Sequence, residues 1–394
     1  MRILMVDVAP FRLSPTQLAE VRDSLSAAIE AGLASEGQQV AALPGFLAPP
    51  KPNVTGEALV VDTGGTNMRA AWVELSADNT PRLKAGPVTK PLDLRGDKRV
   101  DRAEFFRMQA ALVEALDAPK GLPVGYCFSY PSEVLPNLDA RLLQWTKGID
   151  LPDVDDTLVG EGLMTALKSV EPKSICVLND TVAALLAASL TGAGEPEHGV
   201  GLIVGTGTNM ACYASVENAP KLSGRAGPGA MAINLESGNF HPPHLTEADE
   251  TVDRESLNPG QQRYEKAMSG FYLPFIYKAA YPELSGFDPH AGTQVLAEMR
   301  RDRPDSDEGR LAAAILDRAA VLVGAGLAAV LCLYGEGTTA MILAEGSLYW
   351  RGPGFAARAE TTLQQLLPEG ISFTVHRIED ANLFGAAAAA LAEQ

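Results

Sequence analysis

Two glycine-rich turns, each lying between two apolar runs, constrain the fold of this chain more than any other feature of its sequence. In the first, the apolar run of residues 58–61 ends at Asp62, the turn TGGTN follows, and a second apolar run covers residues 70–73. Residues 200–213, VGLIVGTGTNMACY, repeat this plan. The pattern predicts strand, turn and strand in both places.

The first turn has the spacing of neither common nucleotide-binding loop, because a dinucleotide fold needs GxGxxG and a P-loop needs GxxxxGK[ST], each opening a helix. A glycine hairpin can instead present backbone N–H groups and short polar side chains to a phosphate, with the Asp62 carboxylate beside it. Taken alone, this segment could equally be a hairpin without a ligand. The second copy predicts two related halves that face each other across a cleft and hold a nucleotide between them.

Composition limits the classes of partner. The 394 residues are enough for two domains, and a net charge of -17 argues against nucleic acid or an anionic membrane surface as a partner. The four cysteines are scattered singly, which predicts reduced, buried thiols in a cytoplasmic protein. The N-terminus has no signal-peptide pattern, and the apolar run 311–333 contains Asp317 and Arg318, so we expect a buried core helix and no membrane span.

Asp180 is the strongest single candidate for a catalytic group. The apolar run 175–178 predicts a strand, and the sequence VAALLAASL after Thr181 predicts a helix, so Asp180 should lie at the carboxyl end of a strand and the start of a helix. Open α/β sheets place ligands at such strand ends. A helix cap is the competing interpretation, because aspartate is a favoured N-cap residue.

Two other segments carry weaker signals. The loop of residues 142–148 ends in Thr146-Lys147-Gly148, which could direct small donors into a cleft or form an exposed turn. His241 and His244 have two prolines between them and no obvious third ligand, so we interpret that segment as a surface loop and not as a metal site.

Taken together, these motifs resemble the hexokinase family of the eukaryotic type over nearly the whole chain. The matching segments, in order, are LVVDTGGTNMR, FSYP, WTKG, VLNDTVA, GLIVGTGTN, NLESG, SLNPGQQRYEK and AEGSLY. The zinc-binding cysteine cluster of the other bacterial sugar-kinase group does not occur in the sequence. The resemblance implies an α/β protein with the two-domain actin-like ATPase (ribonuclease H-like) fold and a cleft between its domains. The small domain would comprise residues 57–178 and 380–394, and the large domain residues 1–56 and 179–379.

The resemblance also implies roles for individual residues. Asp180 would be the general base, with Arg69 and Lys147 as further catalytic residues, and Asp62 would lie near Mg²⁺, through a water molecule. The implied hexose-binding residues are Ser129, Thr146, Lys147, Asn179, Asp180, Asn209, Glu236 and Glu265. The implied nucleotide-binding residues are Asp62, Gly64, Gly65, Thr66, Asn67, Arg69, Gly205, Thr206, Gly207, Thr208, Gly346 and Ser347.

Three departures from the family pattern leave details open. Ser237 stands where the family has tryptophan, which leaves the hexose preference open. Residues 380–385 read DANLFG in place of a glycine-rich turn, and residues 350–353 read WRGP in place of Lys-x-His-Pro, which leaves the details of ATP binding open.

The implied reaction is ATP-dependent phosphorylation of a hexose, foremost D-glucose, at the 6-hydroxyl with Mg²⁺, the first step of glycolysis. The expected partners are the hexose and MgATP, with no nucleic acid and no membrane, in a monomer or homodimer. Two alternatives remain: a sugar-responsive binding protein with little activity, and another kinase or ATPase of the superfamily that acts on a different acceptor.

Overall fold

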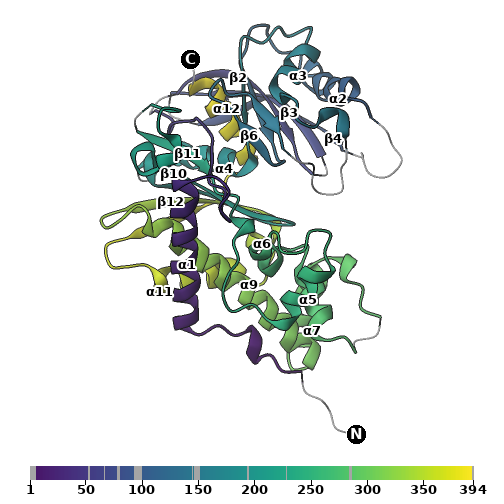
Figure 1. Ribbon diagram of the computed structural model, residues 1–394. Helices are drawn as coiled ribbons and strands as arrows, with labels where there is room; N and C mark the ends of the chain where they lie inside the picture. Colours follow the sequence, from purple (N-terminus) through teal and green to yellow (C-terminus); the bar gives the residue numbers. More distant parts are fainter. Residues whose placement is uncertain are drawn as a thin grey trace.

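The computed structural model describes residues 6–51, 54–65, 67–77, 80–92, 100–143, 145, 151–192, 195–227, 229–283 and 286–392. Within these ranges the chain forms two mixed β-sheets with helices between them and on their outer faces (Figure 1). The α/β class and the two-domain architecture expected from the sequence are confirmed.

The first predicted hairpin forms the centre of one five-stranded sheet. Its strands lie in the order β4-β3-β2-β5-β8, with β2 and β3 antiparallel and with β5 and β8 parallel to β2. The strands of this sheet are β2 (Gly56–Thr63), β3 (Asn67–Leu75), β4 (Pro81–Pro91), β5 (Val124–Phe128) and β8 (Ile175–Leu178). A separate small hairpin joins β6 (Ser132–Val134) and β7 (Ala140–Leu142).

The second predicted hairpin forms the centre of a six-stranded sheet with the same plan. Its order is β1-β11-β10-β9-β12-β13, where β9 and β10 are antiparallel and β12 and β13 run parallel to β9. Its strands are β1 (Leu43–Pro44), β9 (Gly199–Val204), β10 (Thr208–Ser215), β11 (Ala230–Asn234), β12 (Thr339–Glu345) and β13 (Ser372–His376). Five strands of each sheet therefore correspond in order and direction, as the repeated motif predicted.

The two sheets enclose a layer made of the helices α4 (Asp180–Ala188) and α12 (Ala381–Ala392). Along β2, Leu59 and Val61 face an outer core, while Ala58 and Val60 face this shared layer. The layer is thin because both helices are rich in alanine. Figure 1 shows α12, in yellow, beside β2 and α4.

Glycines allow the backbones in this layer to approach closely. A Cβ atom on Gly385 of α12 would lie 1.8 Å from the carbonyl oxygen of Ala183 in α4. On Gly201 of β9 it would lie 2.3 Å from the Thr181 oxygen, and on Gly125 of β5 it would lie 2.1 Å from the Ala386 oxygen. No other residue fits these positions without moving an element.

The remaining helices cover the outer faces of the two sheets. Those outside the five-stranded sheet are α2 (Arg102–Glu114) and α3 (Val159–Ala166). Those associated with the six-stranded sheet are α1 (Pro15–Ala34), α5 (Glu247–Glu255), α6 (Arg263–Met268), α7 (Leu273–Ala280), α8 (Gln294–Asp302), α9 (Asp307–Cys332), α10 (Ser347–Arg351) and α11 (Phe355–Leu366). Helix α1 begins with a capping box between Ser14 and Gln17.

By length and composition alone, α9 would pass as a membrane span, but 83% of its most apolar window is buried inside the protein. The expected core helix is therefore confirmed, and it begins at Asp307, before the first residue of the predicted run. The Arg318 side chain of this helix is 1% exposed and donates two hydrogen bonds to the Asp249 carboxylate. The four cysteines are free thiols, three of them buried.

We predict that Gly385→Ala destabilises the protein by about 2–4 kcal/mol, because the added Cβ overlaps the Ala183 carbonyl. Without that contact, alanine in a helix would stabilise by up to about 1 kcal/mol. Urea unfolding followed by circular dichroism measures the difference. Gly227→Ala is the control, since nothing lies within 4 Å of its added Cβ. Equal stability of Gly385→Ala and wild type would contradict this view of the helix layer.

Candidate active site

Three parallel strands bring the first group of predicted site residues to one edge of the five-stranded sheet. In the register of β2, β5 and β8, Asp62 lies opposite Cys127, and Cys127 lies opposite Leu178. The carboxyl ends of these strands therefore coincide; Ser129 follows directly after β5, and Asn179 and then Asp180 follow β8. This is the sheet edge at which open α/β folds bind ligands.

Asp180 is the first residue of α4, and Asn179 is its N-cap, with its side chain accepting from the Thr181 N–H at 2.8 Å. The N-cap interpretation of Asp180 was therefore wrong. The Asp180 Oδ1 accepts from the N–H of Thr181 at 2.8 Å and from its hydroxyl at 3.3 Å. No described residue donates to Oδ2, and the side chain is partly exposed. One carboxylate oxygen is thus available to a ligand.

The first glycine turn is closed by backbone contacts. The Gly64 N–H donates to the Asn67 carbonyl at 3.0 Å, and the Tyr130 hydroxyl donates to the Gly64 carbonyl at 2.9 Å. The Ser129 N–H donates to the Thr63 carbonyl at 3.1 Å. The predicted sugar segment and the predicted phosphate turn are therefore neighbours. Gly65 lies in the same turn.

Arg69 on β3 contacts two carboxylates. Its Nη2 and Nε donate to Asp62 Oδ2 at 2.6 and 3.0 Å, and its Nη1 donates to Asp380 Oδ1 at 2.8 Å. Burial acts to lower the pKa of the Arg69 guanidinium, but Asp62 and then Asp380 outweigh it and raise that pKa. Burial raises the pKa of the Asp62 carboxyl, against the effect of Arg69, and Asp180 raises it further. Asp62 and Asp180 therefore lie within electrostatic reach of each other.

The second glycine turn meets the third predicted nucleotide segment. A Cβ atom on Gly205 would lie 3.6 Å from the Gly346 Cα and 3.8 Å from the Ser347 nitrogen. This contact follows from the parallel pairing of β9 with β12, which places both segments at one sheet edge. Gly346 has φ 106° and its Cβ would lie 2.1 Å from the Val204 oxygen, so only glycine fits there.

One polar group at the end of the second turn has no hydrogen-bond partner among the described residues. The Thr208 hydroxyl is buried and makes no hydrogen bond to the described residues. Two backbone hydrogen bonds support the turn itself. The Gly270 N–H donates to the Gly205 carbonyl at 2.7 Å, and the Phe271 N–H donates to the Thr206 carbonyl at 3.1 Å. An orphaned hydroxyl on a supported glycine turn suits a phosphate oxygen.

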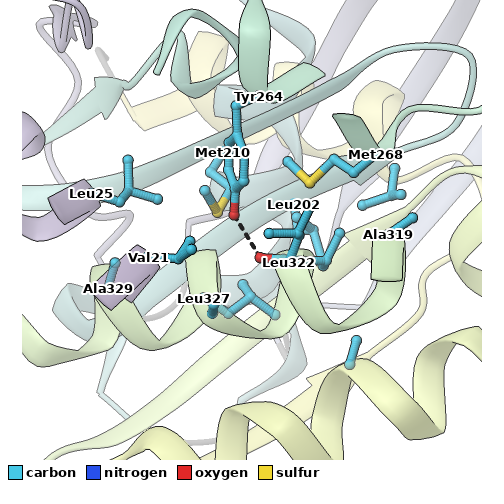
Figure 2. Close-up of a cluster of buried hydrophobic side chains, with 14 of the residues drawn as sticks. Val21, Leu25, Leu202, Met210, Tyr264, Met268, Ala319, Leu322, Leu327 and Ala329 are labelled. Carbon is cyan, nitrogen blue, oxygen red and sulfur yellow. Dashed lines mark hydrogen bonds between the residues drawn. The ribbon is translucent and has the colours of Figure 1, made fainter. Parts of the chain in front are cut away.

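Glu265 links the sugar segment to this turn. Its Oε2 accepts from the Thr208 N–H at 2.9 Å, and a Cβ on Gly207 would lie 2.8 Å from the same oxygen. The preceding residue, Tyr264, anchors α6, because its hydroxyl donates to the Leu322 carbonyl of α9 at 2.6 Å. Figure 2 shows this bond among buried side chains that include Met210 and Met268.

Asn209, Asn234 and Glu236 form a chain of side-chain hydrogen bonds. Asn209 Nδ2 donates to Asn234 Oδ1 at 2.7 Å, and Asn234 Nδ2 donates to Glu236 Oε1 at 2.8 Å. Asn209 Nδ2 also reaches the Thr181 hydroxyl at 3.1 Å. Ser237, buried completely, donates its N–H to Asn209 Oδ1 at 3.1 Å. Two predicted sugar ligands are therefore joined to the helix that begins with Asp180.

A small hollow adjoins these residues. Its walls include Leu43 and Asn234 from the six-stranded sheet, and Tyr130, Val134 and Asn179 from the other side. It lies beside Asn179 and does not include Asp180 or Glu236 among its lining residues. The hollow therefore separates elements of the two sheets next to the predicted sugar residues.

Three predicted site residues, Thr66, Thr146 and Lys147, lie outside the described residues, so their roles stay predictions. Sequence reasoning missed the contributions of Thr181, Asn234 and Gly270, and treated Asp380 only as part of an altered turn. The sequence signal for Thr181 and Asn234 was their position near the predicted residues Asp180 and Glu236. Their shared partner Asn209 lies on β10, and the sequence does not reveal that contact.

Two sequence profiles described as Hexokinase match residues 7–190, and residues 199–297 with 309–392. The chain belongs to the hexokinase family. It is 30% identical to the hexokinase of Schwanniomyces occidentalis, with 90% of this chain and 84% of that protein aligned. It is 32% identical to human Hexokinase-3, with 98% of this chain but 46% of that protein aligned.

A solved structure is also similar to this chain over nearly its whole length. A hexokinase from Schistosoma mansoni, determined in complex with glucose, matches with a TM-score of 0.84 and 27% sequence identity, covering 98% of this chain and 97% of that one. This hexokinase shares the two-domain fold, which supports the fold expected from the motifs.

The departures from the family pattern have local explanations. Ser237 fits a fully buried site beside Asn209. Trp350 donates its Nε1 to the Ala344 carbonyl at 2.7 Å, and the Arg377 guanidinium lies 5.7 Å from the centre of its ring. Asp380 contacts Arg69, so the altered turn still reaches the site.

Glu345, at the end of β12 before Gly346, gives a test of site electrostatics. Burial raises the pKa of its carboxyl from 4.5 to about 7, although Arg377 and Arg69 act to lower it. The folded protein therefore holds this proton more tightly than the unfolded chain. Its contribution to stability is greatest below about pH 4.5 and is lost as the pH rises to about 7.

We predict that Glu345→Gln removes the loss of folding stability that the Glu345 carboxyl causes as the pH rises to about 7. The variant should gain more stability over wild type at pH 8 than at pH 5, by on the order of 1–2 kcal/mol, a value reduced from the full shift because the group is partly exposed. Urea unfolding at the two pH values measures the gain, with the exposed Glu369→Gln as control. A gain that is independent of pH would refute the prediction.

Proposed function

We propose that this protein transfers the γ-phosphoryl group of ATP to the 6-hydroxyl of a hexose, with D-glucose as the first candidate and Asp180 as general base. The observation that carries the proposal is the position of Asp180, partly exposed at a sheet edge that also holds Asp62, Ser129 and the first glycine turn. The relatives named above are hexokinases, and the solved relative contains glucose.

The mechanism requires positioning more than covalent chemistry, because phosphoryl transfer passes through a loose transition state. Gly205, Gly207 and the Thr208 hydroxyl would hold the phosphates of ATP, with Gly346 and Ser347 on the nucleoside side. Arg69 would neutralise charge that develops on the transferred group. Asp180 would accept the proton of the sugar hydroxyl as its oxygen attacks phosphorus.

A sugar site needs both hydrogen-bond donors and hydrogen-bond acceptors, since each sugar hydroxyl donates and accepts hydrogen bonds. Asn179, Asn209 and Ser129 supply amide and hydroxyl groups, while Glu236 and Glu265 accept. Thr146 and Lys147 complete the proposed set.

Magnesium fits this site as a companion of ATP. Among the described residues, no group of three or more His, Cys, Asp or Glu side chains could hold a metal ion. Mg²⁺ commonly binds through one carboxylate, water molecules and substrate phosphates, without a protein cage. Asp62 would be that carboxylate, through a water molecule, and the bound ion would neutralise phosphate charge.

Closure of the cleft would exclude water, which competes with the sugar as nucleophile. The small domain of this proposal comprises residues 57–178 and 380–394, and the large domain residues 1–56 and 179–379. A cytoplasmic location and a monomeric or homodimeric state also stay predictions.

We predict that Asp180→Ala lowers kcat by about 100-fold or more, the usual contribution of a general base, while glucose still binds. A coupled assay with ATP and glucose measures turnover, and isothermal titration calorimetry measures sugar binding. Asp155→Ala, at an exposed position, is the control. Near-normal turnover of Asp180→Ala would refute the role of this carboxylate.

A panel of sugars with ADP release as readout tests the substrate class. We expect release with a hexose that has a free 6-hydroxyl and not with its 6-deoxy analogue. Binding of a hexose without ADP release would favour the sugar-responsive binding protein. Release only with another acceptor would favour a different kinase of the superfamily.

Glucose should also reduce the radius of gyration, because the sugar bridges the two domains. Small-angle X-ray scattering with and without glucose measures the change, and 6-deoxyglucose tests whether the 6-hydroxyl is needed for closure. An unchanged radius at saturating glucose would count against a closing cleft.

A further inference from the structure

We propose that Asn234 is a positioning residue that orients Glu236 toward the sugar, fixes the Asn209 amide beside it, and thereby sets the affinity for the hexose. The proposal rests on the proposed function, since it assigns a role within the same sugar site. Asn234 is the first residue of the NLESG segment but has none of the site roles assigned above, and it acts through its two neighbours.

Asn234 ends β11, is 6% exposed, and lies between the two predicted ligands, accepting from Asn209 Nδ2 at 2.7 Å and donating to Glu236 Oε1 at 2.8 Å. Both ends of one primary amide are therefore used, each toward a different sugar ligand. The bond to Asn209 also fixes the orientation of that amide, because its Nδ2 must be the donor.

The backbone of Glu236 has an unusual conformation that its neighbours support. This residue has φ 52° and ψ 43°, a left-handed conformation that a glutamate rarely adopts without support from its surroundings. The Asn234 side chain supplies that support, because it holds the Glu236 carboxylate directly and also accepts weakly from the Glu236 N–H at 3.4 Å. The carboxylate is thereby held in one direction before the sugar arrives.

A chain of hydrogen bonds joins Asn234 to the proposed base. Asn209 Nδ2 also donates to the Thr181 hydroxyl, and that hydroxyl reaches Asp180 Oδ1. Asn234 therefore closes a continuous series of side-chain contacts that runs from Glu236 to Asp180 across α4, β10 and β11. Preorganised ligands cost less ordering entropy when a substrate binds, so this series should favour sugar affinity.

The chemistry of an amide is necessary at this position. Aspartate has the same shape and can still accept from Asn209, but its ionised second oxygen would repel Glu236 Oε1 in place of donating to it. A protonated aspartate would donate again and restore the contact. The substitution Asn234→Asp therefore makes the proposed contact dependent on pH.

Among the described residues, the titratable groups that the contacts place around position 234 are carboxylates. Glu236 is the direct contact, Asp180 on α4 is reached through Thr181 and Asn209, and Glu265 on α6 packs against Gly238 near Glu236. The residues of β1 that pair with β11, Leu43 and Pro44, do not titrate. The described neighbours are acidic, which favours the protonated form of an introduced aspartate.

The test compares wild type, Asn234→Asp and Asn234→Ser at pH 8 and pH 5.5, with KM and kcat for glucose from the coupled assay and the glucose Kd from calorimetry. We expect Asn234→Asp to raise KM and Kd about 10- to 100-fold at pH 8, with kcat within about 3-fold of wild type, as for loss of a hydrogen bond to a charged group. At pH 5.5 the ratio of the variant KM to the wild-type KM should be at least about 5-fold smaller than at pH 8, because a protonated aspartate restores the contact with Glu236.

Asn234→Ser separates positioning from general damage, because serine is too short to reach both neighbours and does not titrate. It should raise KM to a similar extent at both pH values. The exposed Asn218→Asp is the matched control for the added charge. Thermal melts of every variant at both pH values show whether each remains folded.

Three outcomes would overturn the inference: Asn234→Asp within 2-fold of wild type at pH 8, an increase in KM that is the same at both pH values, or an effect confined to kcat. If wild type itself fails to phosphorylate any hexose, the proposed function fails instead. The two failures are thus distinguishable by the wild-type assay alone.

Discussion

The close contact between α4 and α12 is the constraint on which the rest of the structure depends. Gly385 brings α12 against the carbonyl of Ala183, and Gly201 and Gly125 bring the two sheets onto the same helix pair. Because α4 begins with Asp180, this packing fixes the position of the proposed base relative to both sheets. The helix layer between the sheets therefore determines where the proposed base lies at the sheet edge.

The sheet topology explains why distant motifs meet. Parallel pairing of β2 with β5 and of β5 with β8 places three carboxyl ends together, and parallel pairing of β9 with β12 does the same for Gly205 and Gly346. No single segment contains the site. The two glycine turns are equivalent in topology but differ in their neighbours, since Arg69 with its carboxylates follows the first and Glu265 supports the second.

Sequence patterns predicted the hairpins, the Asp180 strand end and the core helix because each depends on local periodicity or on a short turn. The resemblance supplied the order of the motifs. What the sequence could not supply were contacts between segments far apart in the chain. Asn209 and Asn234 are neighbours through strand pairing, and Asp380 reaches Arg69 across 311 residues of sequence. The sequence also left open whether Asp180 is the N-cap of α4, because asparagine and aspartate are both good caps and only the backbone geometry assigns the cap to Asn179.

Glu265 carries a further consequence. One of its oxygens accepts from the Thr208 N–H in the second glycine turn, while Tyr264 beside it is fixed to the core helix α9. The carboxylate that would recognise the sugar is therefore part of the scaffold that presents the phosphate turn. A change of sugar preference obtained at this residue, in evolution or by engineering, would alter the affinity for the phosphoryl donor as well.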